Sequence, residues 1–160
     1  MPLFFYFYTL IKNYLLARII ALDYGNKRVG IAVTDPLQMI ASALETVPSH
    51  EIFRFLTDYF RKEEVNEIVV GYPKKLNNQP SESVRYINPF IKKLEETYPL
   101  KKIVLVDERF TSRIAFQTMI DGGLKKKQRQ DKGLIDKISA AIILQSFLES
   151  SQAGNRKDID

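Results

Sequence analysis

The sequence predicts a single α/β domain in which a mixed sheet is flanked by helices. Two observations lead to this class: short, continuously apolar runs typical of buried strands, and longer segments whose apolar residues recur at helical spacing. A length of 160 residues suits one domain with one substantial core. The sequence contains neither an internal repeat nor a linker that would divide it.

The expected strands follow the apolar runs along the chain. They cover residues 18–22, 29–33, 40–47, 67–70 and 103–106. Turn residues at 23–27 separate the first two runs, which predicts a hairpin at this point.

The expected helices follow segments in which apolar residues recur every three or four positions. They cover residues 52–60, 84–98, 111–120 and 134–149. Pro89 should kink or interrupt the second helix, and Gly122 with Gly123 should end the third. A mobile basic loop is expected before the last helix. The predicted order of elements is therefore β-β-β-α-β-α-β-α-α.

Residues 17–150 carry this pattern, and the two ends of the chain do not. We interpret residues 1–16 as an extension outside the fold, with a packed extra helix or a membrane-surface anchor as alternatives, and residues 151–160 as a polar tail. The apolar stretch ends at Lys12, which makes it too short to span a bilayer, and no basic region precedes it as in a signal peptide. We expect no stable membrane insertion and a cytoplasmic location.

The composition excludes several kinds of chemistry. The chain has no cysteine and one histidine, His50. Disulfide scaffolds, thiolate zinc sites, iron–sulfur clusters and cysteine nucleophiles are therefore excluded, as are histidine-cluster metal sites within one chain. Any catalysis must depend on carboxylates, hydroxyls, lysines and arginines.

The net charge of +5 is concentrated in one part of the chain. Residues 101–137 contain ten basic and five acidic side chains, and the other residues balance. Such an excess indicates a polyanionic partner, or else a solvated lysine-rich loop. The segment 122–133 has a glycine at each end and is expected to close on phosphates. Its basic residues are Lys125, Lys126, Lys127, Arg129 and Lys132.

Three carboxylates are candidates for a functional site. Asp23 ends the first expected strand and Glu108 follows the last, and ligand sites gather at the carboxyl ends of parallel strands. Asp136 begins a helical stripe that continues through Ala140 and Ile143, so it should face inward. Burying such a charge is costly unless a metal, a basic partner or a helix terminus offsets it.

Each of these acids also has a purely structural interpretation. Asp23 is two residues before a glycine and could belong to a turn, while Glu108 could form a surface ion pair with Arg109. Asp136 could interact with the dipole of its own helix. Together, however, three carboxylates form a ligand set suited to hard divalent cations. Two such ions can stabilise the attacking and leaving oxygens of phosphodiester hydrolysis.

Four strings of the sequence resemble the YqgF family of small bacterial resolvase-type nucleases. They are ALDYG (21–25), RVGIA (28–32), DERFTS (107–112) and DKISAAIILQ (136–145). The resemblance extends from about residue 18 to 148, with the motifs in family order. It implies an RNase H-like fold and an activity in processing the 5′ end of pre-16S ribosomal RNA. The family also carries an older description as enzymes that cut Holliday junctions.

The resemblance implies particular roles for residues of this chain. Asp23, Glu108 and Asp136 match the acidic triad of the family, which implies catalytic residues that bind Mg²⁺ or Mn²⁺. Arg28, Arg109 and Lys132 match candidate phosphate contacts. Gly25 and Gly30 match motif glycines, and Gly71-x-Pro73 matches a family loop. Residues 1–16 and the segment 77–80 depart from the family pattern.

The expected function is that of a metal-dependent nuclease acting on precursor ribosomal RNA. Structured DNA, the ribosome and the precursor of its small subunit are further expected partners. The alternatives are a ribosome-assembly factor that binds nucleic acid without turnover, and a Holliday-junction resolvase. Asp23-x-Gly25 also resembles the phosphate loop of actin-like ATPases, but those proteins need a second lobe that this chain is too short to contain.

Overall fold

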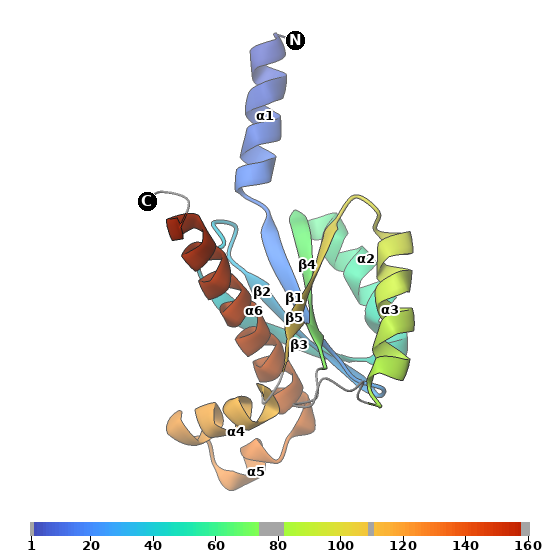
Figure 1. Ribbon diagram of the computed structural model, residues 1–160, viewed down its shortest axis with the longest axis vertical. Helices are drawn as coiled ribbons and strands as arrows, with labels where there is room; N and C mark the ends of the chain where they lie inside the picture. The colour runs from blue at the N-terminus through green and yellow to red at the C-terminus, as the bar shows by residue number, and fades with distance from the viewer. Residues whose placement is uncertain (1, 74–81, 109–110, 158–160) are drawn as a thin grey trace.

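The fold is a five-stranded mixed sheet with helices on both faces (Figure 1). A computed structural model describes residues 2–73, 82–108 and 111–157. The strands are β1 (Arg18–Tyr24), β2 (Arg28–Thr34), β3 (Ala41–Pro48), β4 (Val65–Tyr72) and β5 (Lys102–Asp107), arranged in the order β3-β2-β1-β4-β5. The first three pair antiparallel, whereas β1, β4 and β5 are parallel. The predicted class, a mixed sheet flanked by helices in one domain, is confirmed.

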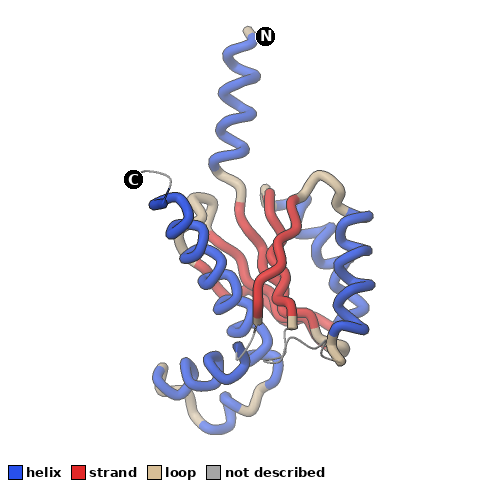
Figure 2. The backbone as a smooth tube through the Cα atoms, in the orientation of Figure 1, coloured by secondary structure: helices blue, strands red, loops and turns tan. Residues whose placement is uncertain are grey.

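The helices are divided between the two faces of the sheet (Figure 2). After η1 (Ser49–Glu51), helices α2 (Ile52–Lys62) and α3 (Val84–Thr97) cover one face, and α6 (Lys132–Lys157) crosses the other along β1, β2 and β3. Helices α4 (Thr111–Asp121) and α5 (Lys126–Arg129) pack near the start of α6. The first turn of α6 therefore lies at the end of the sheet where β1 ends.

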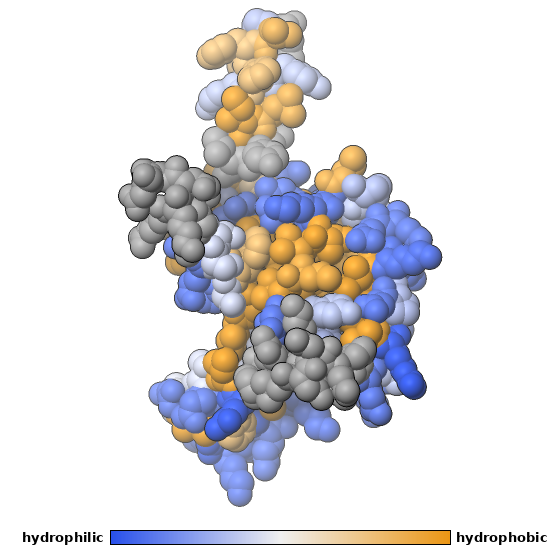
Figure 3. Space-filling model, viewed as in Figure 1, coloured by the Kyte–Doolittle hydropathy of each residue, from blue (hydrophilic) through white to orange (hydrophobic). Residues whose placement is uncertain are grey.

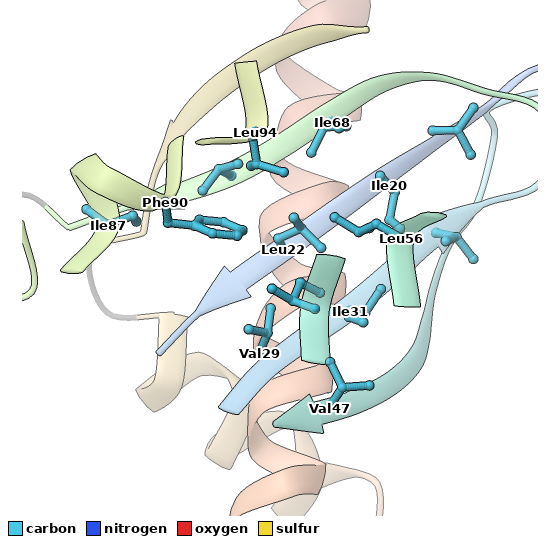
Figure 4. Close-up of a cluster of buried hydrophobic side chains, with 14 residues drawn as sticks. Ile20, Leu22, Val29, Ile31, Val47, Leu56, Ile68, Ile87, Phe90 and Leu94 are labelled. Carbon is cyan, nitrogen blue, oxygen red and sulfur yellow. The ribbon is translucent and has the colours of Figure 1, made fainter. Parts of the chain in front are cut away.

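The strand β1 is buried on both faces, which explains why its sequence is continuously apolar. Ile20 and Leu22 point into the core beneath α2 and α3 (Figure 4). Ile19 and Ala21 point the other way, into the core beneath α6. Side chains of a strand alternate between faces, so neighbouring residues stabilise two separate layers.

Helix α3 is continuous through Pro89, so the predicted interruption is wrong. Proline cannot donate a hydrogen bond to the carbonyl four residues earlier, which typically costs about 3 kcal/mol inside a helix. Pro89 itself is exposed, whereas Ile87, Phe90 and Leu94 of the same helix are buried in the core. Packing of this face stabilises the helix despite the missing bond.

Two other expectations near the C-terminus need correction. Helix α6 continues to Lys157 instead of ending near residue 149, so the first part of the predicted polar tail is helical. Apolar periodicity indicates only the part of a helix that packs on a core, so it does not predict how far the helix continues into polar residues. The basic segment 122–133 also contains the single-turn helix α5, where a loop was expected.

The end of α4 follows the prediction. Gly123 has a φ of +76°, a conformation that glycine adopts without steric cost. The amide of Leu124 donates to the carbonyl of Met119 at 3.1 Å, and the amide of Gly123 donates to that of Ile120 at 3.0 Å. These two bonds define a Schellman motif, which ends the helix and turns the chain toward α5.

Helix α1 (Leu3–Leu15) projects from the start of β1 and is not packed on the sheet (Figure 1). Its apolar side chains from Leu3 to Ile11 are exposed, with Phe4 at 82% exposure (Figure 3). The alternative of a packed extra helix is therefore not observed. In the part of the chain that the structure describes, no helix combines the length and the apolarity needed to cross a membrane.

Candidate active site

Asp23 and Glu108 meet at one end of the sheet. Asp23 lies in β1 and Glu108 directly follows β5, so β4 lies between them. Their carboxyl groups nevertheless form a side-chain hydrogen bond. The predicted convergence of these two acids is therefore observed, although the strands that carry them are not neighbours.

A glycine in β4 lets the two carboxyl groups reach each other. Gly71 pairs with Val106 in β5 and follows Val70, the pairing partner of Leu22 in β1. A Cβ atom at Gly71 would lie 2.7 Å from Oε2 of Glu108 and 2.6 Å from Cδ1 of Ile143. The missing side chain thus provides the space that Glu108 occupies across β4.

A second glycine brings helix α6 to the same place. Gly30 in β2 pairs directly with Asp23. A Cβ atom at Gly30 would overlap the backbone carbonyl of Asp136 in the first turns of α6. The helix can approach β2 this closely because residue 30 has no side chain, and the approach places Asp136 beside Asp23.

The start of α6 is held by two further contacts. Oδ1 of Asp131 accepts hydrogen bonds from the amides of Gly133 at 2.9 Å and Leu134 at 3.2 Å, as an N-capping residue does. Oγ1 of Thr46, in β3, donates to the carbonyl of Gly133 at 2.6 Å. Sequence reasoning missed both residues. An aspartate just before the last helix is a local capping signal that could have identified Asp131, whereas the role of Thr46 depends on the position of a distant element.

Asp136 forms an ion pair with Arg28. Nε of Arg28 donates to Oδ2 of Asp136 at 2.7 Å, and both side chains are partly exposed. Arg28 is the first residue of β2, so this contact ties the β1–β2 hairpin to α6. The expected phosphate contact at position 28 is therefore engaged by a carboxylate in this structure.

The electrostatics of the site favour protonation of the carboxyl pair. Burial raises the pKa of Asp23 well above its usual value, and the charge of Glu108, the hydrogen bond with Glu108 and the charge of Asp136 raise it further. Burial also raises the pKa of Glu108; the hydrogen bond with Asp23 opposes this change, and the charge of Asp107 adds to it. Two carboxylates in contact resist losing both protons unless a cation is present.

The donor set fits a hard divalent cation, since it consists of carboxylate oxygens alone. Only two of the three acids are in mutual contact, because Asp136 is turned toward Arg28. Accordingly, no group of three acidic or histidine side chains in the described parts of the chain is already arranged to hold an ion. Asp23 and Glu108 form the centre of the candidate site, and Asp136 stands at its edge.

A cavity of about 370 Å³ opens beside Asp23 and Asp136. Its lining combines these two acids with three basic side chains. The residues are Asp23, Gly25, Asn26, Lys27, Arg28, Lys132 and Asp136. Lys132 was a predicted phosphate contact, whereas Lys27 and Asn26 were not singled out, although their place in the turn after Asp23 is a signal that could have identified them.

The remaining basic candidates are not part of this cavity lining. Lys125, Lys126 and Lys127 are exposed around α5. The guanidinium of Arg129 lies over the ring of Phe116, 5.8 Å from its centroid, so its observed contact is structural. Arg109 lies outside the described residues.

The five-stranded mixed sheet with helices on both faces has the predicted RNase H-like fold. RuvC from T. thermophilus, solved in complex with a Holliday junction substrate, superposes with a TM-score of 0.50 at 13% identity, covering 85% of this chain and 96% of that chain. At this identity the likeness concerns the fold alone.

The chain belongs to the RuvX family, whose model, described as "Holliday junction resolvase", matches residues 17–150. A protein of Flavobacterium johnsoniae is 56% identical over 137 residues, covering 86% of this chain and 99% of its own length. A protein of Phocaeicola vulgatus has the same identity and coverage. Both carry the name "Putative pre-16S rRNA nuclease". The resemblance seen in the four motifs is thus confirmed.

Proposed function

We propose that this protein is a metal-dependent nuclease that hydrolyses phosphodiester bonds in precursor 16S ribosomal RNA, at its 5′ end. The observation that carries the proposal is the contact between the carboxyl groups of Asp23 and Glu108, with Asp136 beside them. Asp23 and Asp136 also line a cavity to which three basic side chains contribute. The names of the relatives from F. johnsoniae and P. vulgatus support the choice of substrate. A cytoplasmic location follows from this substrate.

Asp23, Glu108 and Asp136 would hold Mg²⁺ or Mn²⁺, which supplies a Lewis acid for hydrolysis and a means of activating water. The contribution of the chain is to bring the three acids together through Gly30 and Gly71, whose missing side chains allow the close approach. The cavity beside the acids is the place where a phosphate of the substrate would bind.

The basic residues that line the cavity would bind the nucleic-acid backbone. Lys27 and Lys132 line the cavity directly, and the lysines around α5 extend the positive surface along the chain from Lys132. Contacts of lysine and arginine with phosphates position a nucleic acid without reading its sequence. Selection of the cleavage site would then depend on the shape of the RNA.

A cleavage assay on three substrates tests this proposal and its alternatives. Precursor 16S RNA, mature 16S RNA and a four-way DNA junction are incubated with the protein in Mg²⁺, in Mn²⁺ and in EDTA. We expect metal-dependent cleavage of the precursor alone. Preferential cleavage of the junction would favour a resolvase, and tight binding of the precursor without cleavage in either metal would favour an assembly factor without turnover.

The lysines around α5 should contribute to binding through counterion release. Each phosphate contact that is lost reduces the salt slope of RNA binding by about 0.7–0.9. We expect a Lys125→Ala/Lys126→Ala/Lys127→Ala variant to bind RNA more weakly, with a slope reduced by about 1–3. The slope is measured from binding isotherms at several salt concentrations, in EDTA to prevent cleavage.

A matched variant controls for the loss of total charge. Lys12→Ala/Lys62→Ala/Lys92→Ala removes three exposed lysines from α1, α2 and α3, away from the cavity. Its slope should remain close to that of the wild type. Equal slopes for both triple variants and the wild type would show that the lysines around α5 are only solvated surface.

The raised pKa values predict how stability depends on pH without metal. In the unfolded chain both carboxyl groups have a pKa of about 4. Above that pH the folded protein retains protons that the unfolded chain releases. The stability that the carboxyl pair of Asp23 and Glu108 contributes is therefore fully present below about pH 4. It is lost as the pH rises through the raised pKa of the folded state. We expect the unfolding free energy of the wild type to fall relative to that of Asp23→Asn/Glu108→Gln from pH 4 upward.

Urea unfolding in EDTA at a series of pH values measures this difference. Addition of Mn²⁺ at neutral pH should restore the stability of the wild type more than that of the double variant, because a cation bound only to the folded state stabilises it. Parallel pH profiles for the two proteins would contradict the account of the carboxyl pair.

A further inference from the structure

Arg28 occupies an unusual place among the basic residues of the cavity. It lines the cavity together with Lys27 and Lys132, but it also makes an ion pair with Asp136, one of the three candidate metal ligands. Its Nε atom donates to Oδ2 of Asp136 at 2.7 Å. The guanidinium thus already supplies a positive charge to this carboxylate.

The ion pair accounts for the incomplete arrangement of the acids. Asp23 and Glu108 are in contact with each other, while the side chain of Asp136 is turned to Arg28. A divalent cation shared by all three acids would need the carboxylate of Asp136 turned toward Asp23 and Glu108, whereas its Oδ2 now accepts from Arg28. The two cations therefore compete for one ligand.

The ion pair between Arg28 and Asp136 is weak enough for a divalent cation to displace Arg28. The side chains of Arg28 and Asp136 are 38% and 24% exposed, so water screens the interaction on one side. Ion pairs with this degree of exposure contribute little stability. A divalent cation carries twice the charge of the guanidinium and would also interact with Asp23 and Glu108, which Arg28 is not observed to contact within the described residues.

We propose that Arg28 is a positioning residue that holds Asp136 while the site contains no divalent cation and releases it when the cation binds. The proposal rests on the metal site of the proposed function. Arg28 lowers the metal affinity of the site by competing for Asp136. Once released, its guanidinium remains at the cavity beside Lys27 and Lys132, where it can bind a phosphate of the RNA.

Binding of Mn²⁺ to the intact protein tests the competition directly. The affinity is measured from the electron paramagnetic resonance signal of free Mn²⁺, without RNA. Arg28→Gln should bind Mn²⁺ about 1.5–5-fold more tightly than the wild type, the range expected for loss of a partly exposed ion pair. Lys27→Gln removes the same charge from the same cavity lining without removing a contact to Asp136, so its affinity should increase less.

A double-mutant cycle and a kinetic measurement distinguish the competition from a structural role. In an Asp136→Asn background, the additional effect of Arg28→Gln should fall to that of Lys27→Gln. In cleavage assays at saturating Mn²⁺, Arg28→Gln should raise KM for the RNA, although it lowers the Mn²⁺ concentration needed for half-maximal rate. A structural role would instead weaken metal and RNA binding together.

The outcomes separate this proposal from the proposed function. Weaker Mn²⁺ binding by Arg28→Gln would overturn the competition, and so would a gain no larger than that of Lys27→Gln. Either result leaves the metal site intact if the wild type binds Mn²⁺ and Asp23→Asn does not. Failure of the wild type to bind Mn²⁺ would refute the metal site, and the role of Arg28 with it.

Discussion

Asp23→Asn, Glu108→Gln and Asp136→Asn are each expected to reduce cleavage of precursor RNA by about 100-fold or more. A catalytic cation stabilises the transition state by several kcal/mol, and each 1.36 kcal/mol corresponds to a factor of ten in rate. An amide preserves the shape of the side chain but removes the negative charge that binds the cation. Initial rates in Mg²⁺ and in Mn²⁺ measure the loss.

Stability measurements on the same three variants exclude an indirect effect. Without metal, Asp23→Asn and Glu108→Gln each remove one of two mutually repelling groups, so the melting temperature should stay level or rise. Asp136→Asn also loses the partly exposed ion pair with Arg28, which contributes little stability, so its melting temperature should stay nearly level. If the three acids served only the packing of the fold, the melting temperatures would fall and the folded fraction would cleave at a nearly normal rate. Three variants that all cleave at the wild-type rate would end the nuclease interpretation of these acids.

Gly30→Ala is expected to have the largest effect on stability among single substitutions near the site. The new Cβ atom would overlap the backbone carbonyl of Asp136, so α6 as a whole must move away from β2. Overpacking of this kind costs about 3 kcal/mol, which corresponds to a decrease of roughly 6–12 °C in melting temperature. Thermal unfolding followed by circular dichroism measures the change.

Gly71→Ala is the informative comparison. Its Cβ atom would meet the ends of two side chains, Glu108 and Ile143, and these can move where a backbone cannot. We therefore expect a smaller loss of stability than for Gly30→Ala, together with a large loss of cleavage because Glu108 is displaced from Asp23. Gly122→Ala, where the Cβ atom would lie 3.3 Å from the carbonyl oxygen of Thr118, serves as a control with little effect on cleavage. A melting temperature of Gly30→Ala equal to that of the wild type would contradict the close approach of α6.

The three central strands, β1, β2 and β4, could be predicted because burial on both faces leaves a continuous apolar run. Their ends could not, because pairing is a property of the backbone and continues into polar residues. Tyr24 was expected in the turn 23–27, yet it pairs with Val29, and Arg28, just before the predicted strand 29–33, is the first residue of β2. The helix through Pro89 was misjudged for a related reason: packing of residues far apart in sequence outweighs a local preference.

The candidate site could be predicted in part. The rule that functional groups gather at strand ends identified Asp23 and Glu108, and the helical stripe identified Asp136. The sequence does not show that β4 lies between the first two acids, so the role of Gly71 became visible only with the order of strands. The ion pair between Arg28 and Asp136 joins residues 108 positions apart, and nothing in the local sequence indicates it.

The most direct test of the central claim is the location of bound Mn²⁺ by anomalous diffraction from crystals of the active protein. We expect an anomalous peak at the carboxylate oxygens of Asp23 and Glu108, with Asp136 as a further ligand and the ion pair between Asp136 and Arg28 broken. A peak bound elsewhere on a protein that still cleaves precursor RNA would contradict the assignment of these three acids as the metal site.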